Sequence, residues 1–222
     1  MKYQSLLKAS VACVLAHLAN MSTSFANTPP PTVDESISSS RRSWQATSKP
    51  SAGLRMGNLE VKLERTTLAE IVAATNLGTI RHRGDAGESV YWLCYTVVEN
   101  EKAARVWIQA SGEMGGPEHD VTEIAVRSIA NHPLASDCPV LPKQFSKLSF
   151  GNGVSLGASK VEVGNLLGSG MISSGSQSFI GYHGKESGDG QCDGGYDLLN
   201  SLFLTFEAGV VVGIDAGQVT SC

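Results

Sequence analysis

Five residues, Gly153-Val154-Ser155-Leu156-Gly157, match the G-x-S-x-G pattern, in which an exposed serine on a strand-to-helix turn acts as a nucleophile. Such a serine needs a histidine as its base and a carboxylate to orient that histidine. No Asp and then His follow Ser155 in this order, because the last histidine of the chain is His183. The pattern therefore favours a glycine-rich start of a helix. A secreted hydrolase that uses Ser155 stays open as an alternative.

A second group of candidate residues lies in the Asp- and Gly-rich loop 188–197, which holds Asp189, Asp193 and Asp197. Carboxylates are the ligands that calcium prefers, but their spacing here does not match the D-x-[DN]-x-[DN]-G loop. A plain turn is favoured, with a small-ligand or metal binder as the alternative. The histidines are scattered without ligand spacing, so no metal or cofactor is expected: His82, His119, His132 and His183.

The first 26 residues have the three parts of a secretory signal peptide. Lys2 and Lys8 form a basic region, an apolar run extends from Ala9 to Ala19, and Ser24-Phe25-Ala26 is a small-x-small cleavage site. The run is well short of the roughly 20 residues that span a bilayer. The sequence therefore predicts a periplasmic or secreted protein without stable membrane insertion.

The charge of the mature chain limits its partners. Without Lys2 and Lys8, 15 of the 17 basic residues remain against 21 acidic ones, a formal charge of −6. An acidic chain is a poor match for nucleic acid or an anionic membrane. Residues 27–56 contain three prolines, Pro29 to Pro31, followed by a Ser-rich stretch, a composition that predicts a disordered tether.

The stretch Leu198–Asp215 alternates as a β-hairpin does, with Leu202, Leu204 and Phe206 on one side of the first strand. A three-residue loop, Glu207 to Gly209 with Gly209 left-handed, would gather the large aliphatic side chains on one buried face. A two-residue loop would mix apolar and polar residues on both faces, so the longer loop is predicted.

Two capping boxes start two short helical patterns, one at Thr67 with Glu70 and the other at Ser159 with Glu162. Strands are predicted at 90–98, 104–110 and 121–127, and near-constant offsets between the halves indicate an internal repeat. The predicted fold class is α+β, with two tandem repeats of short helices packed on an antiparallel sheet. The predicted units are a first repeat at 57–130, a Pro-rich linker at 131–149 and a second repeat at 150–222.

Four cysteines remain after the leader, an even set that predicts two disulfides in an exported chain. The C-x-x-C spacing of zinc sites is absent. Four cysteines allow three connectivities, and the predicted duplication favours pairing within each unit. The expected bridges are Cys94 with Cys138 and Cys192 with Cys222.

The second unit resembles the SmpA/OmlA (BamE-like) envelope lipoprotein domain. The resemblance lies in the helix start Leu156-Gly157-Ala158-Ser159-Lys160, the helix end at Gly168, and a hairpin with Leu202, Leu204, Phe206, Gly209 and Ile214. Two such units in tandem resemble the β-lactamase inhibitor protein (BLIP-like) superfamily, whose members act by binding other proteins. The first unit departs from the pattern at Glu64 and Arg65. No lipobox is visible, which speaks against lipid anchoring.

One strand face carries residue types that are common in protein interfaces. Ala104, Val106 and Ile108 match a buried set, which leaves Arg105, Trp107 and Gln109 on the other face, and Phe203 is their counterpart in the second half. Aromatic residues and arginine are enriched at interface hot spots. The sequence therefore predicts a non-enzymatic protein-binding module, inhibitor-like or assembly-like, whose partner is an envelope or secreted protein. A contact between the two units is the alternative for these rings.

Overall fold

In the computed structural model, described for residues 28–33, 44–112, 118–130, 137–186 and 195–222, strands predominate. Eight of them form one antiparallel sheet in the order β3-β4-β5-β6-β11-β10-β9-β8, and three more form a small sheet in the order β2-β1-β7. Their bounds are β1 Gly53–Met56, β2 Leu59–Lys62, β3 Arg81–Arg83, β4 Val90–Glu99, β5 Lys102–Ser111, β6 Glu123–Ile129, β7 Leu148–Phe150, β8 Ile172–Ser174, β9 Gln177–Glu186, β10 Tyr196–Glu207 and β11 Val210–Ser221.

Two α-helices, α1 (Leu68–Thr75) and α2 (Lys160–Leu167), begin where the sequence predicts them. Both capping boxes form. The Thr67 and Ser159 hydroxyls accept from the N–H groups of Glu70 and Glu162, and the two glutamate carboxylates accept from the N–H groups of Thr67 and Ser159. Among the described residues, three short 3₁₀ turns lie at Ala86–Glu88, Lys143–Phe145 and Gly168–Gly170.

The predicted fold class, α+β with short helices on the sheet of each repeat, is wrong. The described chain is mostly β-sheet with two antiparallel sheets and two α-helices. A helix followed by four strands does occur twice, as α1-β3-β4-β5-β6 and α2-β8-β9-β10-β11. The two sets of strands nevertheless share one sheet, because β6 pairs with β11. The prediction had one sheet in each repeat, whereas the structure joins the two sets of strands edge to edge. An unpaired strand edge offers free N–H and C=O groups for such pairing.

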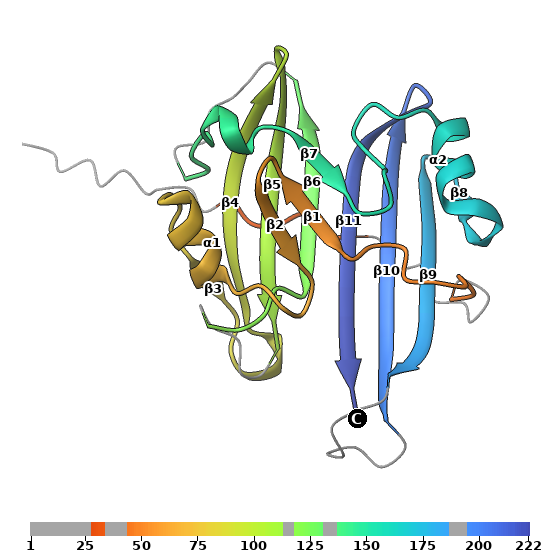
Figure 1. Cartoon of the computed structure of the whole chain (residues 1–222), viewed down its shortest axis with the longest axis horizontal. Coiled ribbons are helices and arrows are strands. Elements are labelled where there is room, and N and C mark those ends of the chain that lie inside the picture. Colours follow the sequence, from red (N-terminus) through yellow and green to blue (C-terminus); the bar gives the residue numbers. More distant parts are fainter. Residues whose placement is uncertain (1–27, 34–43, 113–117, 131–136, 187–194) are drawn as a thin grey trace, which may run out of the picture.

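One face of the large sheet, called the inner face, is covered by α1, the small sheet and α2 (Figure 1). The main hydrophobic core lies between these layers and draws on every one of them, with Ile71 from α1, Val61 from β2, Val163 from α2 and Ile214 from β11. Part of the cover comes from regions that the sequence indicated as a tether and a linker, since β1 begins at Gly53 and β7 at Leu148.

The β10–β11 hairpin has a different register from the predicted one. Glu207 pairs with Val210, so the loop is the two residues Ala208 and Gly209, both left-handed at φ 48° and 81°. A register shift between Thr205 and Phe206 leaves Val212 as the extra residue of a β-bulge. The bulge restores the alternation that a two-residue loop would otherwise disrupt, so Leu204 faces Ile214 across the strands, where the predicted register paired Leu204 with Val212.

Glu64 ties the first helix start to the end of β11. Its φ is 52°, in the left-handed region, and its N–H donates to the carbonyl of Val121. Gly157 has the corresponding place in the second half: it is also left-handed, and its N–H donates to the carbonyl of Val211. The Glu64 carboxylate accepts from Gln218 Nε2 at 2.6 Å and from the N–H of Thr220 at 2.7 Å. Glu64 therefore takes a backbone conformation that favours glycine, while its side chain joins the two halves of the sheet.

Candidate functional site

The register across the sheet defines its second face, called the outer face. Trp107 on β5 lies opposite Cys94 on β4 and Ala125 on β6, and Ala125 lies opposite Asp215 on β11, which faces Phe203 on β10. Neighbouring side chains such as Val106 and Ile108 belong to the main core. Arg105, Trp107, Gln109 and Phe203 therefore lie on the face opposite the main core, as the alternation predicts.

Trp107 is nevertheless covered. It is 6% exposed, its Nε1 donates to the carbonyl of Thr28 at 3.2 Å, and it packs in a second apolar cluster with Trp92, Cys94 and Cys138. The ring thus stabilises a minor core on the outer face rather than standing open to solvent.

The other predicted contact residues show graded exposure. Gln109 is 6% exposed, and Arg105 is half-buried with its guanidinium carbon 5.9 Å from the centre of the Trp107 ring. Phe203 is half-buried and packs on Phe179, with ring centres 4.5 Å apart. Trp44 contacts the same Phe179 ring edge-on at 5.3 Å. Gln109 on β5 and Phe203 on β10 line the same groove from opposite sides, whereas Arg105 and Trp107 are not among the residues that line it.

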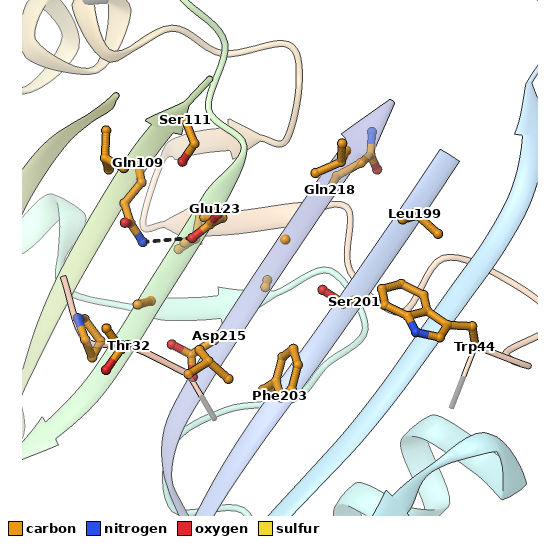
Figure 2. Close-up of a pocket in the computed structure, with 18 of the residues that line it drawn as sticks. Thr32, Trp44, Gln109, Ser111, Glu123, Leu199, Ser201, Phe203, Asp215 and Gln218 are labelled. Atoms are coloured by element: carbon orange, nitrogen blue, oxygen red, sulfur yellow. Dashed lines mark hydrogen bonds between the residues drawn. The ribbon is translucent and has the colours of Figure 1, made fainter. Parts of the chain in front are cut away.

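A groove of about 460 Å³, called the outer groove, opens on this face (Figure 2). Small residues, Ala125 and Gly217, lie at its centre on β6 and β11. Its sides are formed by β5, by the chain at Pro31–Val33, and by β10 with Trp44, and the labelled side chains of Figure 2 surround it: Thr32, Trp44, Gln109, Ser111, Glu123, Leu199, Ser201, Phe203, Asp215 and Gln218.

Hydrogen-bonding groups line the first-half side of the outer groove. Gln109 Nε2 donates to Glu123 Oε2 at 3.4 Å, and this pair is drawn in Figure 2. Below it, Arg127 Nη2 donates to Asp215 Oδ1 at 2.6 Å and Arg127 Nη1 donates to two backbone carbonyls. Desolvation raises the pKa of the Asp215 carboxyl, although the Arg127 charge opposes this. Asp215 in the groove is thus held by a partly buried ion pair with Arg127 that joins β6 to β11.

Exposed aliphatic side chains mark the opposite side of the groove. Leu199 on β10 and Val219 on β11 face each other across the strands and are 38% and 53% exposed. By strand alternation, Val98 lies on the same face at the far end of β4, and Val140 pairs with Thr96 on that strand; the two valines are 38% and 44% exposed. Val210, which precedes the core residue Val211 and pairs with Glu207, lies on this face too, so five of the seven large hydrophobic residues that are exposed in the described chain lie on the outer face.

Residues 28–33, called the N-terminal segment, form the side of the groove next to β5. The N–H of Thr28 donates to Asp137 Oδ2 at 2.5 Å, and its hydroxyl donates to Oδ1 at 2.8 Å. Desolvation raises the pKa of Asp137, but these two hydrogen bonds and the charge of Arg81 outweigh it, so the pKa lies below its usual value. Asp137 is thus an ionised anchor for the segment at neutral pH.

The cysteines confirm one predicted bridge. Cys94 and Cys138 form a disulfide with a Cα separation of 4.7 Å. Cys222 is also disulfide-bonded, and its predicted partner Cys192 lies outside the described residues. A structural disulfide is typical of an oxidising compartment.

The chemistry of the two alternatives, a serine hydrolase and a metal binder, is not assembled among the described residues. Ser155 precedes α2, and no hydrogen bond among the described residues joins its hydroxyl to a histidine. His82 contacts Ser89, and His183 faces Asp197 at 3.5 Å. No group of three or more potential metal ligands occurs in the part of the chain that the structure describes. Residues 187–194, most of the acidic loop, lie outside it, as does the predicted leader.

Sequence reasoning missed Thr28, Asp137, Leu199 and Val219. Leu199 and Val219 carried a usable signal, because continuing the alternation of Leu202 and Leu204 places Leu199 on the other face. Asp137 and Thr28 carried none, since their contact joins residues 109 positions apart.

Comparison of the chain with family models, with curated proteins and with solved structures found no match. The resemblance to the SmpA/OmlA and BLIP-like proteins therefore stays a prediction. Within the described residues, none of the helices has both the length and the apolar character needed to cross a membrane.

Proposed function

We propose that this chain is an exported, non-enzymatic protein-binding module that receives a periplasmic or secreted partner protein in the outer groove. The observation that carries the proposal is the pairing of exposed Leu199 and Val219 beside a groove with hydrogen-bonding groups on its opposite side. Exposed apolar side chains next to hydrogen-bonding groups are a composition found in protein interfaces.

The support beneath the groove suits recognition. Its side chains project from β5, β6, β10 and β11, four neighbouring strands of one sheet, whose inner face is packed against the main core. Sites held on strands keep their geometry better than sites on loops, so less ordering free energy is lost on binding. The resemblance to superfamilies of protein binders supports the same function.

The proposal can be tested by site-specific crosslinking. A photoreactive amino acid at Leu199 or Val219 in the exported protein should trap one dominant envelope or secreted protein from a periplasmic extract. Val161 on α2 is the matched control, because it is a β-branched aliphatic residue, 73% exposed, on a different surface. Equal crosslinking of the same protein from Val161, or none from either groove position, would refute the proposal.

A further inference from the structure

The disulfide and the outer groove are joined by a short series of contacts. Cys138 is bonded to Cys94 on β4, and Asp137 is the residue before it. Asp137 accepts two hydrogen bonds from Thr28, and Thr28 begins the segment whose Pro31–Val33 portion lines the groove. The disulfide holds the residue next to Asp137, and Asp137 holds Thr28, so loss of the disulfide is expected to affect the position of Thr28.

We infer that the Cys94–Cys138 disulfide, acting through Asp137, holds the N-terminal segment in place, so that the outer groove has its full shape only in the disulfide-bonded chain. Asp137 is then a positioning residue. The inference uses the proposed function only to give the groove a role, because the position of the segment can be measured without a partner.

The chain after Asp137 shows why the disulfide fixes its position. Thr96 on β4 donates its N–H to Pro139 at 2.9 Å and its hydroxyl to the Cys138 carbonyl at 3.0 Å. Leu141 donates back to Thr96 at 2.9 Å, so residues 138–141 run parallel to the edge of β4. The disulfide adds a covalent link to these hydrogen bonds, and it acts at Cys138, the residue next to Asp137.

The N-terminal segment depends on its first residue. Pro29, Pro30 and Pro31 have no N–H and cannot form a donor ladder with the sheet. Thr28 supplies what they lack, because it donates twice to Asp137 and accepts from the Trp107 indole. Removing Asp137, or moving it by loss of the disulfide, should therefore free the segment and uncover Trp107.

The indole N–H of Trp107 reports this directly in a nitrogen-15 spectrum of the exported protein. We expect its hydrogen exchange to become about tenfold faster, one factor of ten for about 1.4 kcal/mol, in a Cys94→Ser/Cys138→Ser variant. The Trp92 indole, on a ring that is 1% exposed in the same cluster, should keep its exchange rate and shows that the sheet is intact. The matched control is Cys192→Ser/Cys222→Ser.

Asp137→Ala, with the disulfide intact, should accelerate Trp107 exchange by a similar factor. Combined with the two serine substitutions it should add little, because both changes break one pathway. The inference is overturned if Trp107 exchange stays unchanged in either variant, if Trp92 accelerates equally, or if the control variant has the same effect. If Trp107 responds as expected while groove crosslinking fails, the proposed function is wrong and the positioning role stands.

Discussion

Trp107 shows at the residue scale how a side chain can be on the predicted face and still be buried. Its ring lies on the face opposite the main core, where it donates a hydrogen bond to Thr28 and packs in a cluster with the disulfide. We expect Trp107→Ala to lower the free energy of unfolding by about 3 to 5 kcal/mol, because a buried ring leaves a cavity. Urea denaturation measures this loss. Val219→Ala, on an exposed side chain of the same face, is the control and should stay within about 0.5 kcal/mol.

Asp137 gives stability a defined pH dependence. Its folded-state pKa lies below the usual value of 3.8, so its carboxylate contributes stability above the unfolded-state pKa. That contribution is lost as the pH falls through the folded-state pKa. Wild type should therefore be more stable than Asp137→Asn at pH 7, with a difference that shrinks steadily below pH 3.8. Denaturant titrations across this range decide it, and a difference that is constant with pH would contradict the assignment. Exposed Glu99→Gln is the control.

Glu64 combines an unfavourable backbone with favourable hydrogen bonds. Removing its carboxylate in Glu64→Ala leaves Gln218 and Thr220 without their acceptor, which should cost about 1.5 to 3 kcal/mol. Glu64→Gly should be less harmful, because glycine relieves the left-handed conformation at φ 52°. Thermal unfolding of both variants, with exposed Arg65→Ala as the control, measures the order. If glycine proves worse than alanine, backbone strain at this position has been misjudged.

At the scale of elements, the β10–β11 turn predicts opposite effects at neighbouring positions. Gly209 has φ 81° with nothing within 4 Å of an added Cβ, so Gly209→Ala should cost about 1 kcal/mol through the backbone alone. Ala208 has φ 48°, so Ala208→Gly should be neutral or stabilise by a few tenths of a kcal/mol. Melting temperatures of the two variants test the signs. Losses of equal size at both positions would contradict the two-residue turn.

The sequence predicted those elements whose pattern lies within a few neighbouring residues. Both helix starts followed from a cap and a glutamate three residues later, and β4, β5 and β6 followed from alternation. The hairpin register did not, because a bulge at Val212 has no local signature in a run of three valines. β9 was missed as well, since Gly181 and Gly184 interrupt its apolar pattern.

At the scale of the whole molecule, the sequence could not show that the two halves share one sheet. β6 and β11 pair although they lie far apart in the sequence, at Glu123–Ile129 and Val210–Ser221, so no local pattern indicates their pairing. The sequence predicted the outer face as the binding surface, and this stays a prediction. Its cover by the N-terminal segment was not predictable, because proline-rich composition predicts disorder unless a distant contact such as Thr28 with Asp137 orders it.

The central claim is that a partner protein binds in the outer groove, and a comparison of affinities tests it most directly. The dissociation constant of the crosslinked partner should be measured by titration for Leu199→Asp, for Val219→Asp and for the control Val161→Asp. All three sites are exposed, so each variant should keep its melting temperature within a few degrees. We expect the groove variants to weaken binding at least about tenfold, because a desolvated carboxylate would replace an apolar contact, and Val161→Asp to stay within about twofold. Unchanged affinity in both groove variants, or an equal loss in Val161→Asp, would contradict the claim.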